Sequence, residues 1–231
     1  MDVILVPGLW LDSSSWDAQR APLEAAGHTV HALTMPGLGE PAAASSGIGL
    51  ADWIAATVTA IDAVDGRVAL VGHSGGGNVV WGAADARVER IERVVFVDTF
   101  PPADGGDISA FPVVDDVVPF PGWEFFDDAD VADLDAATRE LWRPRMAAVP
   151  ARVPTDPIAL HDPRRVDLPV TMVTGTFPAA AIGDVIADAP PWAAELGALT
   201  NLEIVEVHSG HWPQFTVPDA LATALVEALA R

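Results

Sequence analysis

The 231-residue sequence contains no cysteine, no tyrosine and no lysine. Without cysteine there is no disulfide, no thiolate nucleophile and no zinc site built on cysteine ligands. Without lysine there is no Walker-type phosphate loop, no Schiff base and no serine–lysine dyad. The lack of tyrosine also excludes a reductase site built on serine, tyrosine and lysine. Serine, threonine, histidine, aspartate and glutamate are the side chains left for covalent or acid–base chemistry.

Positive charge and long apolar runs are also scarce. The chain has 33 acidic and 12 basic residues, a formal net charge of −21. Such a charge repels nucleic acid and anionic membranes, so neither is expected as a partner. No segment approaches the roughly 18 apolar residues of a membrane span, and residues 1–6 lack the basic region and length of a signal peptide. We therefore expect a cytoplasmic protein that acts on a neutral or cationic small molecule. The sequence leaves the oligomeric state open.

Apolar runs typical of buried strands alternate with segments typical of helices. The predicted strands cover residues 3–6, 28–34, 68–71, 94–97, 170–174 and 202–207. Predicted helices run from an N-cap at Ser14 to Gly27, over 50–61 and 75–86, and from Pro218 onward, whereas 41–47 is expected to be a surface loop. This alternation predicts an α/β protein with a doubly wound, mostly parallel sheet of about six strands.

Spacing within the helices indicates which faces are buried. Apolar residues three or four positions apart form one stripe in the second helix (Leu50, Ile54, Val58 and Ile61) and another in the last helix (Leu221, Leu225 and Leu229). Stripes of this spacing pack against a sheet.

The alternation breaks between Asp98 and Leu168, where proline and acidic residues separate short apolar pieces. We expect residues 101–165 to form a small cap (lid) inserted into a core made of residues 1–100 and 166–231. Residues 129–148 within the cap are predicted to be helical. Aromatic residues of the cap either roof an apolar pocket or anchor the cap to the core: Phe111, Phe120, Trp123, Phe125, Phe126 and Trp142.

The most informative stretch is Gly72-His73-Ser74-Gly75-Gly76, between a predicted strand and a predicted helix. A Gly-x-Ser-x-Gly motif in this setting is typical of a strained turn that lifts a serine hydroxyl above the sheet. Cβ atoms at Gly72 or Gly76 would collide with neighbouring elements. The backbone N–H of Gly75 should point at an oxygen bound beside Ser74. His73 is expected to pack beneath the turn. The alternative is a glycine-rich turn with an incidental serine.

A serine hydroxyl needs a base to become a nucleophile. Two candidates follow the last predicted strand: His208 directly after it, and His211 beyond Gly210. We interpret His211 as the base, because Gly210 leaves it free to turn toward Ser74, and His208 as structural. The two histidines also have the spacing of a metal-binding pair, but no further ligands are evident, so no metal is expected.

Pro7-Gly8, the serine motif and Gly210-His211-Trp212-Pro213, in this order, resemble the α/β-hydrolase superfamily over essentially the whole chain. The resemblance is closest to its compact esterase and hydroxynitrile lyase-like branch. It implies a Ser-His-acid triad with Ser74 as nucleophile and His211 as general base. It also implies an oxyanion hole formed by the backbone N–H groups of Leu9 and Gly75. Many members have His-Gly in place of Pro7-Gly8. No cofactor is expected.

The third member of the triad has two candidates. In most members of the superfamily the acid follows the next-to-last strand, but here the first carboxylate after that strand is Asp184. A subset of members places the acid at the end of the strand that follows the nucleophile, where this chain has Asp98. We assign the acid to Asp98 and keep Asp184 as the alternative. Asp98 could otherwise serve as a turn residue that caps the next segment.

These residues predict a serine hydrolase that cleaves a small or medium, apolar, uncharged carboxylic ester or lactone through an acyl-enzyme. Trp10 beside the oxyanion loop, Trp212 beside His211 and Trp123 in the cap are candidate substrate-binding residues, with core packing as the alternative. Two other functions stay open. One is a hydroxynitrile lyase-like or other non-hydrolytic enzyme, against which the absence of a lysine for the cyanide leaving group counts. The other is a ligand receptor on the same scaffold.

Overall fold

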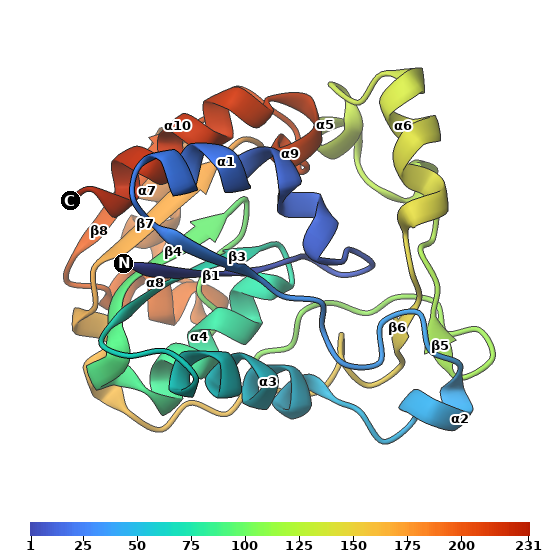
Figure 1. The fold of residues 1–231 in the computed structure, drawn as a ribbon, viewed down its shortest axis with the longest axis horizontal. Helices are drawn as coiled ribbons and strands as arrows, with labels where there is room; N and C mark the ends of the chain where they lie inside the picture. The colour runs from blue at the N-terminus through green and yellow to red at the C-terminus, as the bar shows by residue number, and fades with distance from the viewer.

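A twisted sheet of six parallel strands runs through the middle of the molecule in the computed structural model, which describes residues 1–231 (Figure 1). The strands are β1 (Asp2–Val6), β2 (Thr29–Ala32), β3 (Val68–His73), β4 (Ile91–Val97), β7 (Val170–Thr174) and β8 (Leu202–Glu206). Their order is β2-β1-β3-β4-β7-β8, so the chain starts inside the sheet, runs to one edge and returns to build the other half. The predicted fold class is confirmed.

Helices cover both faces of the sheet. Because side chains alternate along a strand, Val3 and Leu5 of β1 pack under α1 (Asp17–Ala25) and α10 (Pro218–Leu229), which lie side by side (Figure 1). Ile4 and Val6 face the opposite layer, formed by α3 (Leu50–Asp62) and α4 (Gly76–Ala86). With both faces covered, β3 and β7 are buried along their whole length, which explains why apolar residues predominate in both.

The buried face of α3 differs from the predicted stripe. Leu50 and Ile61 are buried as expected, but Trp53 and Thr57 complete the buried face, and Ile54 and Val58 are only partly buried. The helix is rotated toward Trp53, whose indole N–H donates to the carbonyl of Pro36 at 2.8 Å. The Thr57 hydroxyl can be buried because it donates to the carbonyl of Trp53 at 3.1 Å. In α10 the predicted stripe Leu221, Leu225 and Leu229 is buried.

The first helix begins differently from the prediction. Asp12, not Ser14, is the capping residue: its carboxylate accepts the N–H of Ser14 at 2.8 Å and starts a 3-10 turn (Ser13–Trp16) that leads into α1. The helix ends as expected near Gly27, which has a φ of 90°. The N–H groups of Gly27 and His28 donate to the carbonyls of Glu24 and Leu23, the bonding pattern that glycine allows at a helix end.

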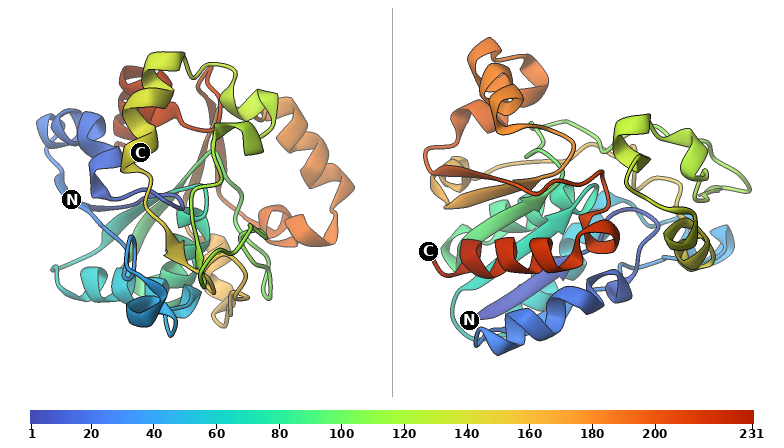
Figure 2. Two further views of the ribbon diagram at one scale, coloured as in Figure 1. Left: turned by 90° about the vertical axis from the view of Figure 1, so that its right-hand side faces the viewer. Right: turned by 90° about the horizontal axis from the view of Figure 1, so that it is seen from above.

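Between β4 and β7 the chain leaves the sheet and folds beyond the carboxyl ends of the strands (Figure 2). This segment contains β5 (Val117–Val118), a 3-10 turn (Trp123–Phe125), α5 (Asp128–Val131), α6 (Ala136–Trp142), a second 3-10 turn (Arg143–Arg145) and β6 (Val149–Pro150). Strands β5 and β6 pair antiparallel. The division of the chain into a core and a cap of residues 101–165 stays a prediction.

Two local predictions in the connecting segments are wrong. Residues 129–148 do not form one helical segment but are split between α5 and α6, because the Asp135 carboxylate accepts the N–H of Thr138 at 2.7 Å and starts a new helix. The loop expected at 41–47 contains one helical turn, α2 (Ala42–Ser45). Its three alanines have the highest helix propensity and follow a proline that fixes the chain entry.

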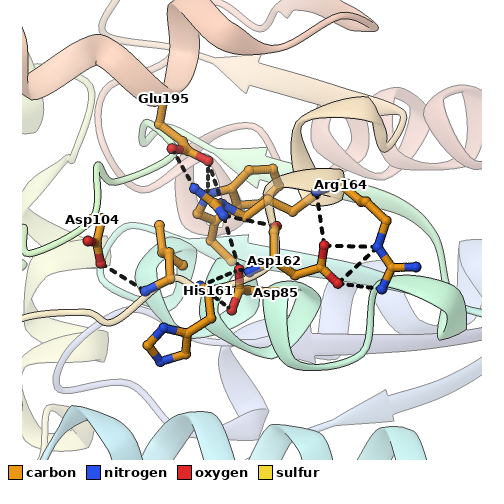
Figure 3. Close-up of polar contacts among 9 residues, drawn as sticks. Asp85, Asp104, His161, Asp162, Arg164 and Glu195 are labelled. Atoms are coloured by element: carbon orange, nitrogen blue, oxygen red, sulfur yellow. Dashed lines mark hydrogen bonds and ion pairs between the residues drawn. The ribbon is translucent and has the colours of Figure 1, made fainter.

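The C-terminal half adds the short helices α7 (Ala179–Asp188), α8 (Ala194–Ala198) and α9 (Pro213–Thr216), and 3-10 turns at Pro163–Asp167 and Pro191–Ala193. A cluster of buried charges joins the end of α4 to this half (Figure 3). Arg165 donates to both carboxylate oxygens of Glu195, at 2.6 and 3.0 Å, and to Asp85 at 3.1 Å. None of the helices is both long enough and apolar enough to cross a membrane. The cytoplasmic location stays a prediction.

Candidate active site

The serine turn lies between the end of β3 and the start of α4. Ser74 has a φ of 51°, a left-handed conformation that is strained for a residue with a side chain. The turn is held by its own backbone: the N–H of Ser74 donates to Val97 of β4 at 3.1 Å, and its carbonyl accepts the N–H of Gly77 at 2.8 Å. The Gly-x-Ser-x-Gly motif thus lies in a strand, strained turn and helix, the context in which it carries a nucleophilic serine.

Glycine is required at both ends of this turn. A Cβ atom at Gly72 would lie 2.5 Å from the carbonyl oxygen of Gly76, and one at Gly76 would lie 2.6 Å from the carbonyl oxygen of Pro7. Both distances are shorter than any real carbon–oxygen contact of this kind. The glycines therefore allow α4 to approach β3 and the loop after β1 closely enough to place Ser74 beside that loop.

His211 and Asp98 lie in line behind Ser74. His211 is in the loop between β8 and α9, and its Nε2 atom is 2.9 Å from the Ser74 hydroxyl oxygen. Its Nδ1 atom is 2.7 Å from a carboxylate oxygen of Asp98, which directly follows β4. The Asp98 side chain is fully buried, whereas 21% of the His211 side chain is exposed. A buried carboxylate, an imidazole and an accessible hydroxyl thus form one hydrogen-bonded chain.

The Asp98 carboxylate is held by the loop after β7. It accepts the backbone N–H groups of Gly175 and Thr176, both at 2.9 Å, and the Thr176 hydroxyl at 2.9–3.0 Å. Burial opposes ionisation of Asp98, but the hydrogen bond and charge of His211 and the two backbone N–H groups outweigh it and lower its pKa to about 2. Asp98 is therefore an anion at neutral pH.

The two alternative residues are placed away from this chain of hydrogen bonds. Asp184 lies on α7 with an exposed side chain and makes no hydrogen bond or ion pair with His211. His208 is exposed at the end of β8 and does not contact Ser74. No group of three or more histidine, aspartate or glutamate side chains is placed to hold a metal ion. The structure thus brings together Ser74, His211 and Asp98, and neither Asp184 nor His208.

The backbone around His211 is fixed by three further residues that sequence analysis did not identify as part of the site. The N–H of His211 donates to the carbonyl of Asp130 at 2.9 Å, and the N–H of Gly210 donates to the Asp133 carboxylate at 2.7 Å. From the opposite side, Nε2 of His73 lies 2.7 Å from the carbonyl oxygen of His211. The Gly-x-Ser-x-Gly motif pointed to His73 as a packing residue, but no sequence signal indicated Asp130 or Asp133.

His73 is neutral and donates this hydrogen bond. It is 1% exposed, and burial together with the nearby His211 lowers its pKa to about 3. Since only an N–H can bond to a carbonyl oxygen, the proton is on Nε2. The other ring nitrogen, Nδ1, has no hydrogen-bond partner and lies against Gly8, whose Cβ would come within 2.8 Å of it. His73 is thus wedged between the loop after β1 and the loop that carries His211.

The two predicted oxyanion donors border Ser74. Leu9 and Gly75 lie outside the helices and strands, and neither backbone N–H donates a hydrogen bond within the protein. Leu9 and Gly75 lie next to each other, because a Cβ atom at Gly75 would lie 3.1 Å from Cγ of Leu9. Gly8, the residue before Leu9, is equally close to Ser74, because a Cβ atom at Gly8 would lie 3.1 Å from the Cβ atom of Ser74. The role of these two N–H groups in binding an oxyanion stays a prediction.

The three predicted substrate-binding tryptophans, Trp10, Trp123 and Trp212, are 3–5% exposed. Trp212 packs edge-to-face against His211, with ring centroids 4.9 Å apart, and against Trp123 at 5.1 Å. Trp10 packs edge-to-face against Phe111, Phe120 and Phe126. Trp142 stacks instead on Phe215 of α9. No surface cavity is lined by the three tryptophans, so their contact with substrate stays a prediction.

A doubly wound parallel sheet with a serine in a strained turn after β3 defines an α/β-hydrolase fold. The chain belongs to the alpha/beta hydrolase family, whose family model matches residues 3–224.

Among proteins of known activity, the chain is similar to a carbendazim hydrolyzing esterase from Nocardioides sp. (strain SG-4G), with 35% identity over 109 residues. The match covers 46% of this chain and 45% of that esterase, just under half of each.

Two solved structures share the fold over nearly the whole chain. One is an extracellular α/β-hydrolase from a Paenibacillus species, with 21% identity and a TM-score of 0.78, covering 99% of this chain and 98% of that one. The other is a methylesterase from Arabidopsis, with 17% identity and a TM-score of 0.75, covering 100% and 99% of the two chains.

Proposed function

We propose that this protein is a serine hydrolase that cleaves a small or medium, apolar, uncharged carboxylic ester or lactone through an acyl-enzyme. The observation that carries the proposal is the chain of hydrogen bonds from Asp98 through His211 to Ser74, at 2.7 and 2.9 Å. In this order of groups an imidazole can take the proton of a serine hydroxyl. The similarity to the Nocardioides esterase, over just under half of that protein, supports ester chemistry.

In the proposed reaction, the Ser74 hydroxyl oxygen attacks the ester carbonyl while Nε2 of His211 takes its proton. The negative oxygen of the tetrahedral intermediate is held by the N–H groups of Leu9 and Gly75, a contribution of about 3–4 kcal/mol for each such donor. His211 then gives its proton to the leaving alcohol, and later activates a water that releases the acid. The ionised Asp98 keeps the imidazole in the correct tautomer and stabilises its positive form.

Hydrolysis of p-nitrophenyl esters of graded acyl length tests this proposal. Ser74→Ala should lower kcat by about a thousandfold or more, because it removes the nucleophile. Asp98→Asn should lower kcat by about 10³–10⁴-fold, because the amide favours the wrong imidazole tautomer. Circular dichroism of both variants should match that of the wild type.

Asp184→Asn is the matched control, since it makes the same chemical change at the alternative acid, on the exposed surface of α7. It should keep kcat within about twofold of the wild type, as distant surface changes do. Undiminished ester hydrolysis by Ser74→Ala would refute the proposal. Wild-type activity of Asp98→Asn together with a large loss at Asp184→Asn would assign the acid to Asp184 and remove Asp98 from the triad.

A further inference from the structure

A surface cavity of about 310 Å³ lies next to the serine turn. Two residues that line it are close in sequence to the proposed triad. Asn78, in the first turn of α4, is four residues after Ser74, and Thr99 directly follows Asp98. A third, Ile108, packs against the serine turn, since a Cβ atom at Gly75 would lie 3.2 Å from its side chain. The other three cavities are lined by residues of α1 and α10, of α3, α4 and the segment 157–161, and of β8, the two residues after it and α10. None of these residues is Ser74, Asp98 or His211, or directly adjoins one of them in sequence.

Aromatic rings lie at this cavity, and two of them are exposed. Phe100 and Trp192 line it, and their ring centroids are 5.6 Å apart in an edge-to-face contact. Phe177 packs against Phe100 in the same geometry at 5.0 Å. Trp192 is 55% exposed and Phe177 is 43% exposed. Large aromatic side chains left open to solvent beside a cavity mark a surface suited to an apolar ligand.

The inner wall of the cavity is polar on one side. Asn78 is only 5% exposed, and its amide nitrogen donates to the carbonyl of Asp107 at 3.3 Å. Its side-chain oxygen accepts no hydrogen bond from the protein and is not fully buried, so solvent reaches it in the cavity. Thr99 is half-buried, and its hydroxyl makes no hydrogen bond within the protein. The Asn78 oxygen is thus available to an N–H or O–H group of a ligand that enters the cavity.

Size and charge restrict that ligand further. A dry cavity of about 150 Å³ holds benzene, so this one has room for about two fused rings. Its lining contains one acidic residue, Asp107, and no basic residue, and the chain carries a net charge of −21. A carboxylate or phosphate would be repelled here, whereas a neutral ring would not.

We propose that this cavity binds the ring of the substrate: an uncharged aromatic or heteroaromatic group of one or two rings, bearing an N–H or O–H donor directed at Asn78. The inference rests on the proposed function, because it places this ring beside the carbonyl that Ser74 attacks. Trp192 and Asn78 are then specificity-determining residues. Trp10, Trp123 and Trp212 line no surface cavity, and of the four cavities this is the one with a lining residue directly next to Asp98 in sequence.

Binding of esters to the Ser74→Ala protein can be measured without hydrolysis, because this variant lacks the nucleophile. The probes are methyl 4-hydroxyphenylacetate, methyl phenylacetate and methyl propanoate, measured by isothermal titration calorimetry. The two ring esters should bind at least about tenfold more tightly than methyl propanoate. Adding Trp192→Ala should raise the Kd of both ring esters about tenfold, through loss of an aromatic contact. Adding Asn78→Leu should raise the Kd of the hydroxylated ester alone, by about fivefold, through loss of one hydrogen bond.

Trp142→Ala is the matched control, because this partly exposed tryptophan of α6 stacks on Phe215 and does not line the cavity. It should leave every Kd unchanged. Since Trp192 is more than half exposed, its truncation does not open the core. The proposal is overturned if the hydroxylated ester does not bind, or if Trp192→Ala and Asn78→Leu both leave its Kd within about twofold.

Turnover by the wild type and by the single Trp192→Ala variant, followed by pH-stat titration, distinguishes this proposal from the function itself. Ring esters that bind as described but are not hydrolysed would overturn the hydrolase and leave the cavity as a binding site. If the esters are hydrolysed, but Trp192→Ala leaves the ratio of kcat/KM between ring ester and methyl propanoate unchanged, the cavity proposal fails and the hydrolase stands.

Discussion

At the scale of single residues, His73 is a fully buried histidine that borders the site. Its ring is enclosed between Gly8 and the His211 backbone, and burial together with His211 lowers its pKa to about 3. An exposed histidine has a pKa near 6.5. Between these two pH values the unfolded chain binds a proton at this residue that the folded protein does not. The free energy of unfolding therefore falls as the pH decreases from about 6.5 toward 3.

The expected size of this effect can be measured. One unmatched proton changes stability by about 1.4 kcal/mol per pH unit, so His73 should account for a loss of about 2–3 kcal/mol between pH 7 and pH 4.5. His73→Gln keeps an N–H donor but cannot titrate. Between pH 7 and pH 4.5 its free energy of unfolding should therefore fall by about 2–3 kcal/mol less than that of the wild type. Urea unfolding at both pH values gives the comparison.

His208→Gln serves as the control, because this histidine is exposed and removal of its ring leaves the site unchanged. Equal pH dependence in the wild type and His73→Gln would show that His73 does not titrate as its burial requires. Asp98 acts in the same direction at lower pH. Its depressed pKa of about 2 means that its contribution is lost as the pH falls from about 3.8 through 2.

At the scale of elements, α5 and the residues after it hold the loop that carries His211. The carbonyl of Asp130 and the carboxylate of Asp133 accept the N–H groups of His211 and Gly210. Only glycine fits at 210, because a Cβ atom there would collide with the Asp130 carbonyl. The segment between β4 and β7 therefore does more than cover the strand ends: it fixes the position of the proposed general base.

Asp133 is accordingly a positioning residue. Asp133→Ala should lower kcat by about tenfold with little change in KM, because the His211 loop loses a charge-assisted hydrogen bond worth about 1.5–3 kcal/mol. Asp133→Asn should restore most of the activity, since its amide oxygen can still accept the Gly210 N–H. Ester hydrolysis kinetics measure both effects.

Asp128→Ala, in α5, is the control, because this exposed carboxylate makes no hydrogen bond. It should leave kcat unchanged. A KM effect without a kcat effect at Asp133→Ala would mean that the residue shapes the substrate site and does not position His211.

At the scale of the whole molecule, Arg165 and two buried carboxylates join distant parts of the chain. The carboxylates, Asp85 and Glu195, are labelled in Figure 3. Arg165 bonds Asp85 at the end of α4 and Glu195 in α8. Asp85 also accepts the backbone N–H groups of His161 and Asp162 at 2.8–2.9 Å, and Glu195 accepts the indole N–H of Trp81 at 3.1 Å. The side chains of Arg165, Asp85 and Glu195 are 5–10% exposed. Removing the arginine would leave two buried carboxylates without their cation.

We therefore expect Arg165→Met to lower the free energy of unfolding by about 3–5 kcal/mol. The neighbouring Arg164 provides a matched control: its side chain is 59% exposed and pairs with Glu89 and Asp162 at the surface. Arg164→Met should cost less than about 1 kcal/mol, as exposed ion pairs do. Urea unfolding of both variants measures the difference. Similar stabilities of Arg165→Met and Arg164→Met would contradict the structural role of the buried cluster.

The sequence by itself determined the features that a short stretch of chain encodes. The four central strands, β1, β3, β4 and β7, follow from mainly apolar runs, because a parallel strand covered on both faces is mainly apolar. The edge strands β2 and β8 carry polar residues between apolar ones. The turn at Ser74 follows from glycines placed where no side chain fits. Errors arose where local preference was weak or ambiguous, as at Asp135, which starts a second helix, and at Trp53, which rotates α3.

The tertiary structure decided everything that depends on segments meeting across the fold. Sequence spacing left Asp98 and Asp184 as alternatives, and only the packing of β4 beside β7 places Asp98 against His211 and against the N–H groups of Gly175 and Thr176, 77 and 78 residues away. The same holds for Asp133 and for the cavity at Asn78 and Trp192. Contacts of this range carry no local signal, because they depend on how whole elements pack and not on the preferences of neighbouring residues.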